Sequence, residues 1–261
     1  MPASRQPTPT RQTANRRTIS EIPYSIAINQ YGSTGQNCAL SALDSFVTGL
    51  AGAASFGFWV KGSDLATVPA YIFGANPAAG GTYCFVGVNR TSGTLGKINL
   101  QLRDNVGDSL GVQCDKPILD GKWHHVVITK DATNTAAGIK FYIDGVLRDK
   151  TTIVSSGTFN DPIAIGRAAT LGSASSGSGL FSGLLAQFGL WQRELTSEEV
   201  VSWHKNNIIP TSAHRYFACD TNAMTTTLVE SIAADNGTLD SVNMWSDQSP
   251  RGGRKSVNLF N

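Results

Sequence analysis

The stretch that decides the fold runs from Leu119 to Leu147 and reads LDGKWHHVVITKDATNTAAGIKFYIDGVL. From Trp123 to Thr129 and from Ile139 to Ile143, apolar residues recur at every second position, which is the period of a β-strand. Asp144-Gly145 supplies residue types that tolerate the positive φ angles of a tight hairpin turn, and Asp120-Gly121 is a second turn signal. The stretch therefore predicts three antiparallel strands joined by two turns.

Similar short alternating runs lie on both sides of this stretch and predict further strands. They are separated by segments rich in Gly, Asn, Asp and Ser, and strands spaced roughly 8–12 residues apart are typical of a β-sandwich. In the C-terminal part, three weaker runs are expected beside the N-terminal strand or as an accessory hairpin. The runs are residues 19–31, 55–61, 71–73, 83–88, 97–103 and 184–191, then 215–219, 244–250 and 256–260.

One helix is predicted after the last strong strand. Thr196 is an N-cap residue with Glu199 three positions later, which is the capping-box pattern. Val200 and Trp203 are spaced to form one packing face, and Asn206-Asn207 is a stop signal. We interpret this helix as structural.

Composition agrees with an all-β chain and excludes several classes of protein. The 261 residues include 27 glycines, and only 15% are charged, which suits many strands and polar turns. The formal net charge of +2 argues against nucleic acid as the main partner. No apolar run approaches the roughly 20 residues that span a bilayer, so no membrane span is expected.

The central stretch resembles the central hairpins of the laminin-G-like, concanavalin A-like jelly-roll family. Three other segments resemble further parts of that family in the same order. Residues 55–61 (SFGFWVK) resemble its early Trp-bearing strand, and residues 162–167 (PIAIGR) resemble its "IG" strand. Residues 181–196 resemble its last core strand and closing helix.

The resemblance implies an all-β, antiparallel β-sandwich (a jelly roll) over residues 19–210, with one short closing helix. Residues 1–18 are then an extended basic arm, and residues 211–261 form strands or a tail packing on or beside the sandwich. Structural roles are expected for Trp59, Trp123, His124, His125, Asp144, Gly145, Trp191, Thr196 and Glu199. This fold hosts lectins, glycosidases, adhesion modules and virion proteins, so it does not by itself choose a function.

The arm, residues 1–18, has no hydrophobic segment of the kind that a secretory signal needs. Its prolines oppose the amphipathic helix of an organellar transit peptide. Two interpretations stay open: a disordered basic tail, or an extended arm that docks on a neighbouring subunit. The candidate assembly residues are Arg5, Arg11, Arg16 and Arg17.

Catalytic signals are weak. Jelly-roll glucanases carry a Glu-x-Asp-x-x-Glu strand, and none of the five glutamates lies in such a pattern or on a strand expected to face a cleft. His124 and His125 are consecutive strand residues and point to opposite faces, so they cannot chelate one ion. We therefore expect no enzyme activity.

Calcium is the candidate cofactor, with Asp104, Asn105 and Asp108 as candidate ligands and Asp131 and Asn134 of similar type nearby. The same residue types also simply make turns. The four cysteines have no Cys-x-x-Cys spacing, so zinc is not expected. Cys84 and Cys114 could form a disulfide only if their strands are neighbours.

Three functions compete at this point. The first is a virion structural protein, such as a capsid decoration or other particle-surface protein of a phage. It would be made in the host cytoplasm and anchored to neighbouring protein subunits by residues 1–18. The second is a glycan-binding, lectin-like module, with or without calcium. The third, a glycosidase, is disfavoured by the missing carboxylates.

Overall fold

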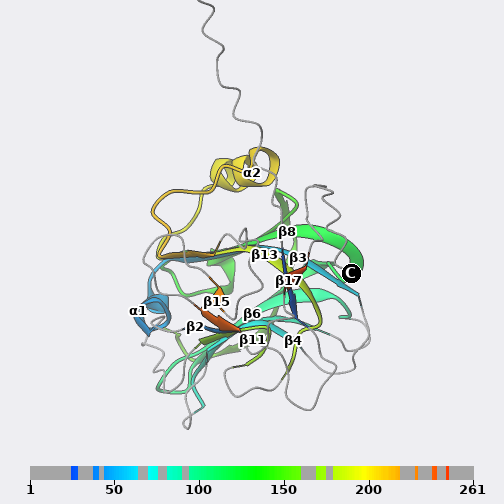
Figure 1. The fold of residues 1–261 in the computed structure, drawn as a ribbon. Coiled ribbons are helices and arrows are strands. Elements are labelled where there is room, and N and C mark those ends of the chain that lie inside the picture. The colour runs from blue at the N-terminus through cyan, green and yellow to red at the C-terminus, as the bar shows by residue number, and fades with distance from the viewer. Residues whose placement is uncertain are drawn as a thin grey trace, which may run out of the picture.

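The computed structural model describes residues 25–28, 38–40, 44–63, 70–75, 81–89, 94–159, 169–174, 179–217, 227–228, 237–239 and 245–246. Within these ranges the chain forms two antiparallel sheets stacked face to face. Figure 1 shows the two layers, with helix α2 lying over the layer that contains β8, β3 and β13. The predicted all-β, antiparallel β-sandwich is confirmed.

The first sheet has the strand order β10-β9-β8-β3-β13-β1-β17, and β14 also pairs with β13. Its centre is the pair β8–β3, in register from Ala54 opposite Lys130 to Lys61 opposite Trp123. Its strands are β10 (Val146–Arg148), β9 (Ile139–Ile143), β8 (Asp120–Lys130), β3 (Ala54–Ser63), β13 (Gly183–Trp191), β1 (Ser25–Ile28), β17 (Trp245–Ser246) and β14 (Arg215–Phe217).

The second sheet has the order β11-β7-β6-β5-β4-β12-β2-β16-β15. Its centre is the run β7-β6-β5-β4, which positions the candidate site described below. Its strands are β11 (Lys150–Ser156), β7 (Ser109–Pro117), β6 (Lys97–Arg103), β5 (Tyr83–Val88), β4 (Ala70–Ala75), β12 (Ala169–Leu171), β2 (Cys38–Leu40), β16 (Gly237–Leu239) and β15 (Thr227–Leu228).

The central stretch folds largely as its alternation predicts. Ile139 pairs with Lys130 and Ile143 with Val126, and the turn residues Asp144 and Gly145 have φ angles of 57° and 76°. The Asp120-Gly121 prediction needs correction, because these residues begin β8 rather than forming a turn before it. Gly121 has a φ of 77°, and the β3–β8 register shifts beside it, so the signal marks an irregular strand start.

The helices are short. Besides α2 (Ser197–Asn206), the structure contains α1 (Asp44–Thr48), which the sequence did not predict, and two 3-10 turns at Gly49–Ala51 and Ala136–Gly138. The α1 helix is stabilised by packing rather than by length: Phe46 is fully buried and meets Phe56 edge-on at 5.4 Å. No helix in the described ranges has the length and apolarity to cross a bilayer.

The core lies between the sheets and consists of the inward-facing residues of both. Phe58 and Phe73 each stack on Phe188, with centroids 6.0 and 5.8 Å apart. Burying one such side chain contributes about 1.5–3 kcal/mol. Cys84 and Cys114 also lie in this core as free thiols, because β6 separates their strands. The disulfide left open by the sequence is therefore not formed.

Strands from the C-terminal part join both sheets. β14 pairs with β13, and β17 pairs with β1 through Ile26 opposite Trp245. β15 and β16 form a hairpin whose second strand pairs with β2. The predictions for residues 1–18, 162–167 and 256–260 fall outside the described residues.

Candidate functional site

The outer face of the first sheet is closed by α2. The Trp203 ring is fully buried and lies 4.6 Å from His125 and 5.2 Å from Trp191, measured between centroids. Its indole N–H donates to Oε1 of Gln187 at 3.1 Å. A Cβ at Gly57 would lie 2.3 Å from the Trp203 ring, so only glycine fits beneath it. This face is a packing interface.

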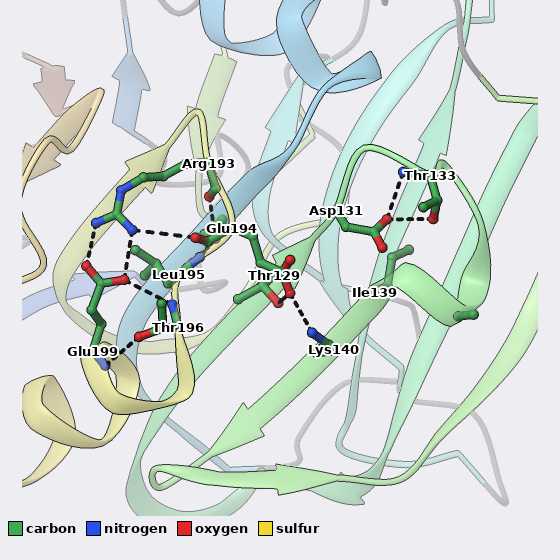
Figure 2. Close-up of polar contacts among 12 residues, drawn as sticks. Thr129, Asp131, Thr133, Ile139, Lys140, Arg193, Glu194, Leu195, Thr196 and Glu199 are labelled. Carbon is green, nitrogen blue, oxygen red and sulfur yellow. Dashed lines mark hydrogen bonds and ion pairs between the residues drawn. The ribbon is translucent and has the colours of Figure 1, made fainter.

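Polar contacts fasten α2 to the sheet. In Figure 2 the Arg193 guanidinium holds both carboxylate oxygens of Glu199, at 2.6 and 2.7 Å, and this pair lowers the pKa of the Glu199 carboxyl. The Thr196–Glu199 capping box is formed in both directions, as the sequence predicts. Glu194 accepts from Lys140 at 2.7 Å. Three of the five glutamates therefore lie at or beside the closing helix.

The two neighbouring histidines have separate environments. His124 lies between two carboxylates, with Nδ1 2.8 Å from Asp144 and Nε2 3.0 Å from Asp120. The hydrogen bond to Asp144 is the largest influence on His124 and raises its pKa, against the effect of burial. His125 packs on the opposite face, against Trp59 at 5.0 Å. The pair does not converge on one ligand.

The calcium candidates form a structural turn. Oδ1 of Asp104 accepts from the backbone N–H groups of Val106 (3.2 Å) and Asp108 (2.9 Å). Asp108 in turn accepts from the Thr158 N–H at 2.9 Å, while Asn105 is exposed on the loop. These donors account for Oδ1 of Asp104 and for one oxygen of Asp108 as turn acceptors. Oδ2 of Asp104 is buried and has no hydrogen-bond partner among the described residues, so the calcium site stays a prediction. Across the described ranges, no three His, Cys, Asp or Glu side chains are grouped to hold a metal.

A small cavity of about 170 Å³ lies beside this turn. Beneath the adjoining loop, the buried Lys130 donates to the carbonyls of Gly52 (2.9 Å) and Asp131 (3.0 Å) and to Oδ1 of Asn134. Burial lowers the pKa of Lys130 to about 8. Asp131 and Asn134 thus hold a loop together. The cavity is lined by Ser109, Leu110, Thr133, Asn134, Thr135, Ala136, Ser155, Gly157, Thr158 and Phe159.

The outer face of the second sheet differs from all of these. On β5, β6 and β7 the core takes every second residue, and the residues between them point outward. On β4, Tyr71 lies on the same outward side, because its ring packs on Phe85. These outward positions carry aromatic rings and amides that sequence reasoning did not single out. We call this set the amide–aromatic face, and it comprises Tyr71, Tyr83, Phe85, Asn89, Asn99, Gln101 and Gln113.

Three rings form a row on this face. Phe85 lies 4.4 Å from Tyr71 and is stacked at 14° on Tyr83 at 4.9 Å. All three side chains are half-buried, so each ring keeps part of its surface accessible. Burial raises the pKa of Tyr71, and the neighbouring Tyr83 adds to the effect, so the Tyr71 hydroxyl stays protonated. The row therefore offers apolar surface together with a hydroxyl group.

Beside the rings runs a chain of amides. Gln101 donates to Asn99 at 3.0 Å, Asn99 donates to Asn89 at 3.1 Å, and Asn89 donates to Oε1 of Gln113. Asn99 and Gln113 are only 2% and 3% exposed, so these side chains are held in place. In the part of the chain that the structure describes, Oε1 of Gln101 and Nε2 of Gln113 have no hydrogen-bond partner. The row of hydrogen-bonded amides thus ends in an acceptor, Oε1 of Gln101, at one end and in a donor, Nε2 of Gln113, at the other.

Gly87 lies between the rings and the amides. A Cβ there would be 3.2 Å from the Tyr71 ring and 3.4 Å from Oδ1 of Asn99, so a side chain would crowd both. The outward positions of β5, β6 and β7 carry one carboxylate, Asp115, which pairs with Lys97 at 3.7 Å and accepts from Thr151 at 2.9 Å. A retaining glycosidase needs two carboxylates about 5–5.5 Å apart, which these positions do not offer.

The sequence contained a signal for this face. Tyr83 and Phe85 alternate on one strand, and Asn99 and Gln101 alternate on another. What was missing was the register, which places Phe85 opposite Gln101 and Asn99 opposite Gln113. Only the pairing of the strands turns separate residues into one surface.

Comparisons with known proteins agree with the architecture. Two similar solved structures are a Bacteroides ovatus protein provisionally assigned to carbohydrate binding and a Ruminococcus gnavus IT-sialidase CBM40 bound to α2,3-sialyllactose. The first has a TM-score of 0.60 at 12% identity, and the match covers 85% of this chain and 59% of that protein's length. The second has a TM-score of 0.50 at 12% identity, covering 70% and 98%.

These similarities show the fold alone. A comparison with curated proteins found no match. The family model described as the concanavalin A-like lectin/glucanases superfamily matches residues 32–201, well over half of the chain. The chain therefore belongs to the concanavalin A-like lectin/glucanase superfamily.

Proposed function

We propose that the protein is a non-catalytic glycan-binding module and that the glycan binds on the amide–aromatic face. The observation that carries the proposal is the row of three half-buried rings beside a chain of amides ending in a donor and an acceptor. A sugar presents an apolar ring face and a rim of hydroxyl groups. Rings and fixed amides complement both features.

Binding without hydrolysis fits the charges of this face. Its one outward carboxylate on β5–β7, Asp115, is paired with Lys97, and Glu194, Glu198 and Glu199 lie at or beside α2 on the other sheet. The two similar structures described by their carbohydrate binding support the same class of function. They share the fold at 12% identity, so the class of ligand extends to this chain only as part of the proposal.

A glycan array tests the proposal directly. The wild-type protein is expected to bind a defined set of glycans, and Phe85→Ala and Gln101→Ala should each weaken those signals. Leu147→Ser is the matched control, because Leu147 is 57% exposed on β10 of the other sheet. A chelator arm tests the predicted calcium dependence. Signals that survive both site substitutions unchanged would place binding elsewhere.

The virion-surface role is a second proposal, and it rests on the basic, proline-bearing arm of residues 1–18. That arm is outside the described residues, so its support comes from the sequence alone. A particle decorated through the arm and displaying a sugar-binding face would combine both proposals. Deleting residues 1–18 should abolish association with the native particle, and a truncated protein that still associates fully would refute the docking arm.

A further inference from the structure

Arg103 ends the row of rings on the amide–aromatic face. It is the last residue of β6, the strand labelled in the lower layer of Figure 1, and its cross-strand partner on β5 is Tyr83. It follows Asn99 and Gln101 at the two-residue period of the strand, so it points outward with them. Arg103 is therefore the cross-strand neighbour of the last ring of the row.

This guanidinium has no ion pair or hydrogen bond within the described chain, although acidic residues follow it closely. Oδ1 of Asp104 accepts two backbone N–H groups, and Asp108 is bound by the Thr158 N–H. Lys97, at the other end of the same strand, is paired with Asp115 at 3.7 Å. Arg103 is thus the unpaired cation among the outward residues of β6.

Two glycines flank the Arg103 side chain. A Cβ at Gly81 would lie 3.6 Å from its Nη1 atom, and a Cβ at Gly107 would lie 3.6 Å from its Nη2 atom. Both glycines have positive φ angles, 75° and 97°, so a larger residue would be strained there. The two ends of the guanidinium fork therefore lie beside bare backbone.

We propose that the amide–aromatic face takes an acidic saccharide whose carboxylate is bound by Arg103 while the same sugar unit stacks on Tyr83. The planar fork of arginine matches a carboxylate through two parallel hydrogen bonds. The adjacent ring places the sugar, and the amide chain beyond it binds the hydroxyls of the next unit. This inference rests on the proposed glycan-binding function and names its ligand class.

The test is calorimetric binding of a uronic-acid oligosaccharide and of its neutral methyl ester. The acid is expected to bind at least tenfold more tightly to the wild type, a difference of about 1.4 kcal/mol. Arg103→Gln should remove that preference, because it weakens binding of the acid more than binding of the ester. Lys97→Gln is the matched control and should keep the preference, because Lys97 is already paired.

Two further measurements separate the shape of the guanidinium from its charge and from the folding of each variant. Arg103→Lys keeps the charge but loses the fork, so an intermediate preference is expected, and thermal melts confirm that each variant is folded. Equal affinity of the wild type for acid and ester, or tighter binding of a sulfated oligosaccharide than of the carboxylated one, would overturn this inference. Ester binding would then still support the proposed function, whereas an array with no bound glycan would end both.

Discussion

The outer faces of the two sheets both present aromatic side chains, but one face is covered by a helix and the other keeps its rings partly exposed. On the first sheet the outward rings of Trp59, His125 and Trp191 pack together with Trp203 of α2 or its neighbours. On the second sheet the rings of Tyr71, Phe85 and Tyr83 pack against one another, beside amides, and stay half-buried. An aromatic row covered by its own helix is scaffold, whereas a similar row beside fixed polar groups is where we propose that a ligand binds.

The largest effect is expected from opening the closed face. Trp203→Ala removes a fully buried ring and should lower the free energy of unfolding by about 3–5 kcal/mol, as measured by urea denaturation. Ile208→Ala, at a side chain 59% exposed just after the same helix, should change it by less than about 0.5 kcal/mol. Similar values for the two variants would mean that α2 is not held by its ring.

The opposite substitution is Phe85→Ala, at the middle of the row on the second sheet. It should weaken the strongest glycan found on the array by about tenfold or more, equivalent to about 1.4 kcal/mol, because the ring touches both neighbours in the row. Calorimetric titration gives the affinity, and Val146→Ala at the exposed edge of the first sheet is the control. An unchanged affinity in a folded variant contradicts the assignment of this face.

A smaller effect is expected from the pH dependence of stability. The raised pKa of His124 means that its ion pairs stabilise the fold fully below its unfolded-state pKa and are lost as pH rises through the folded-state value. The lowered pKa values of Asp120 and Asp144 add stability that disappears as pH falls. Unfolding free energy should therefore peak in the mildly acidic range.

The variant His124→Asn isolates this contribution. Denaturation curves recorded from acid to slightly alkaline pH should show a flatter decline on the alkaline side than in the wild type. Glycan affinity should keep its wild-type value at neutral pH, because His124 bonds to Asp120 and Asp144, and none of the three belongs to the amide–aromatic face. An identical pH profile would show that the two carboxylates do not control this histidine.

The smallest effect concerns the fastening of α2. Glu199→Gln weakens the contact with Arg193 and half of the capping box, yet both side chains are about one-third exposed. Water screens such a pair, so a loss of about 0.5–1 kcal/mol is expected in chemical denaturation. Ser197→Ala, on the exposed first turn, is the control. A loss as large as that of Trp203→Ala would show that the ion pair, not the ring, holds the helix.

The sequence was informative where a signal is local. The Thr196 capping box, the Asp144-Gly145 turn and the alternation of β8 and β9 depend on neighbours a few residues away, and the structure contains all three. The short α1 helix escaped prediction because packing of Phe46 on Phe56, distant in sequence, stabilises it. The turn predicted at Asp120-Gly121 was wrong, because a glycine with positive φ occurs at an irregular strand start as well as in a turn.

The candidate site was out of reach for a related reason. Which face stays accessible depends on where α2 packs, and the Phe85–Gln101 neighbourhood depends on strand register. Whether Arg103 is paired depends on where the Asp104 and Asp108 carboxylates turn, which residue types alone do not reveal.

The free thiols of Cys84 and Cys114 have a practical consequence for measuring motion. Both lie in the core beneath the amide–aromatic face, on β5 and β7, and burial raises the pKa of each thiol. A buried, protonated thiol reacts with an alkylating reagent only when its strand opens. In a chain with Cys38 and Cys219 replaced by serine, the rate of alkylation of Cys84 and Cys114 measures how often this sheet opens. A bound glycan should lower this alkylation rate without contacting either sulfur atom.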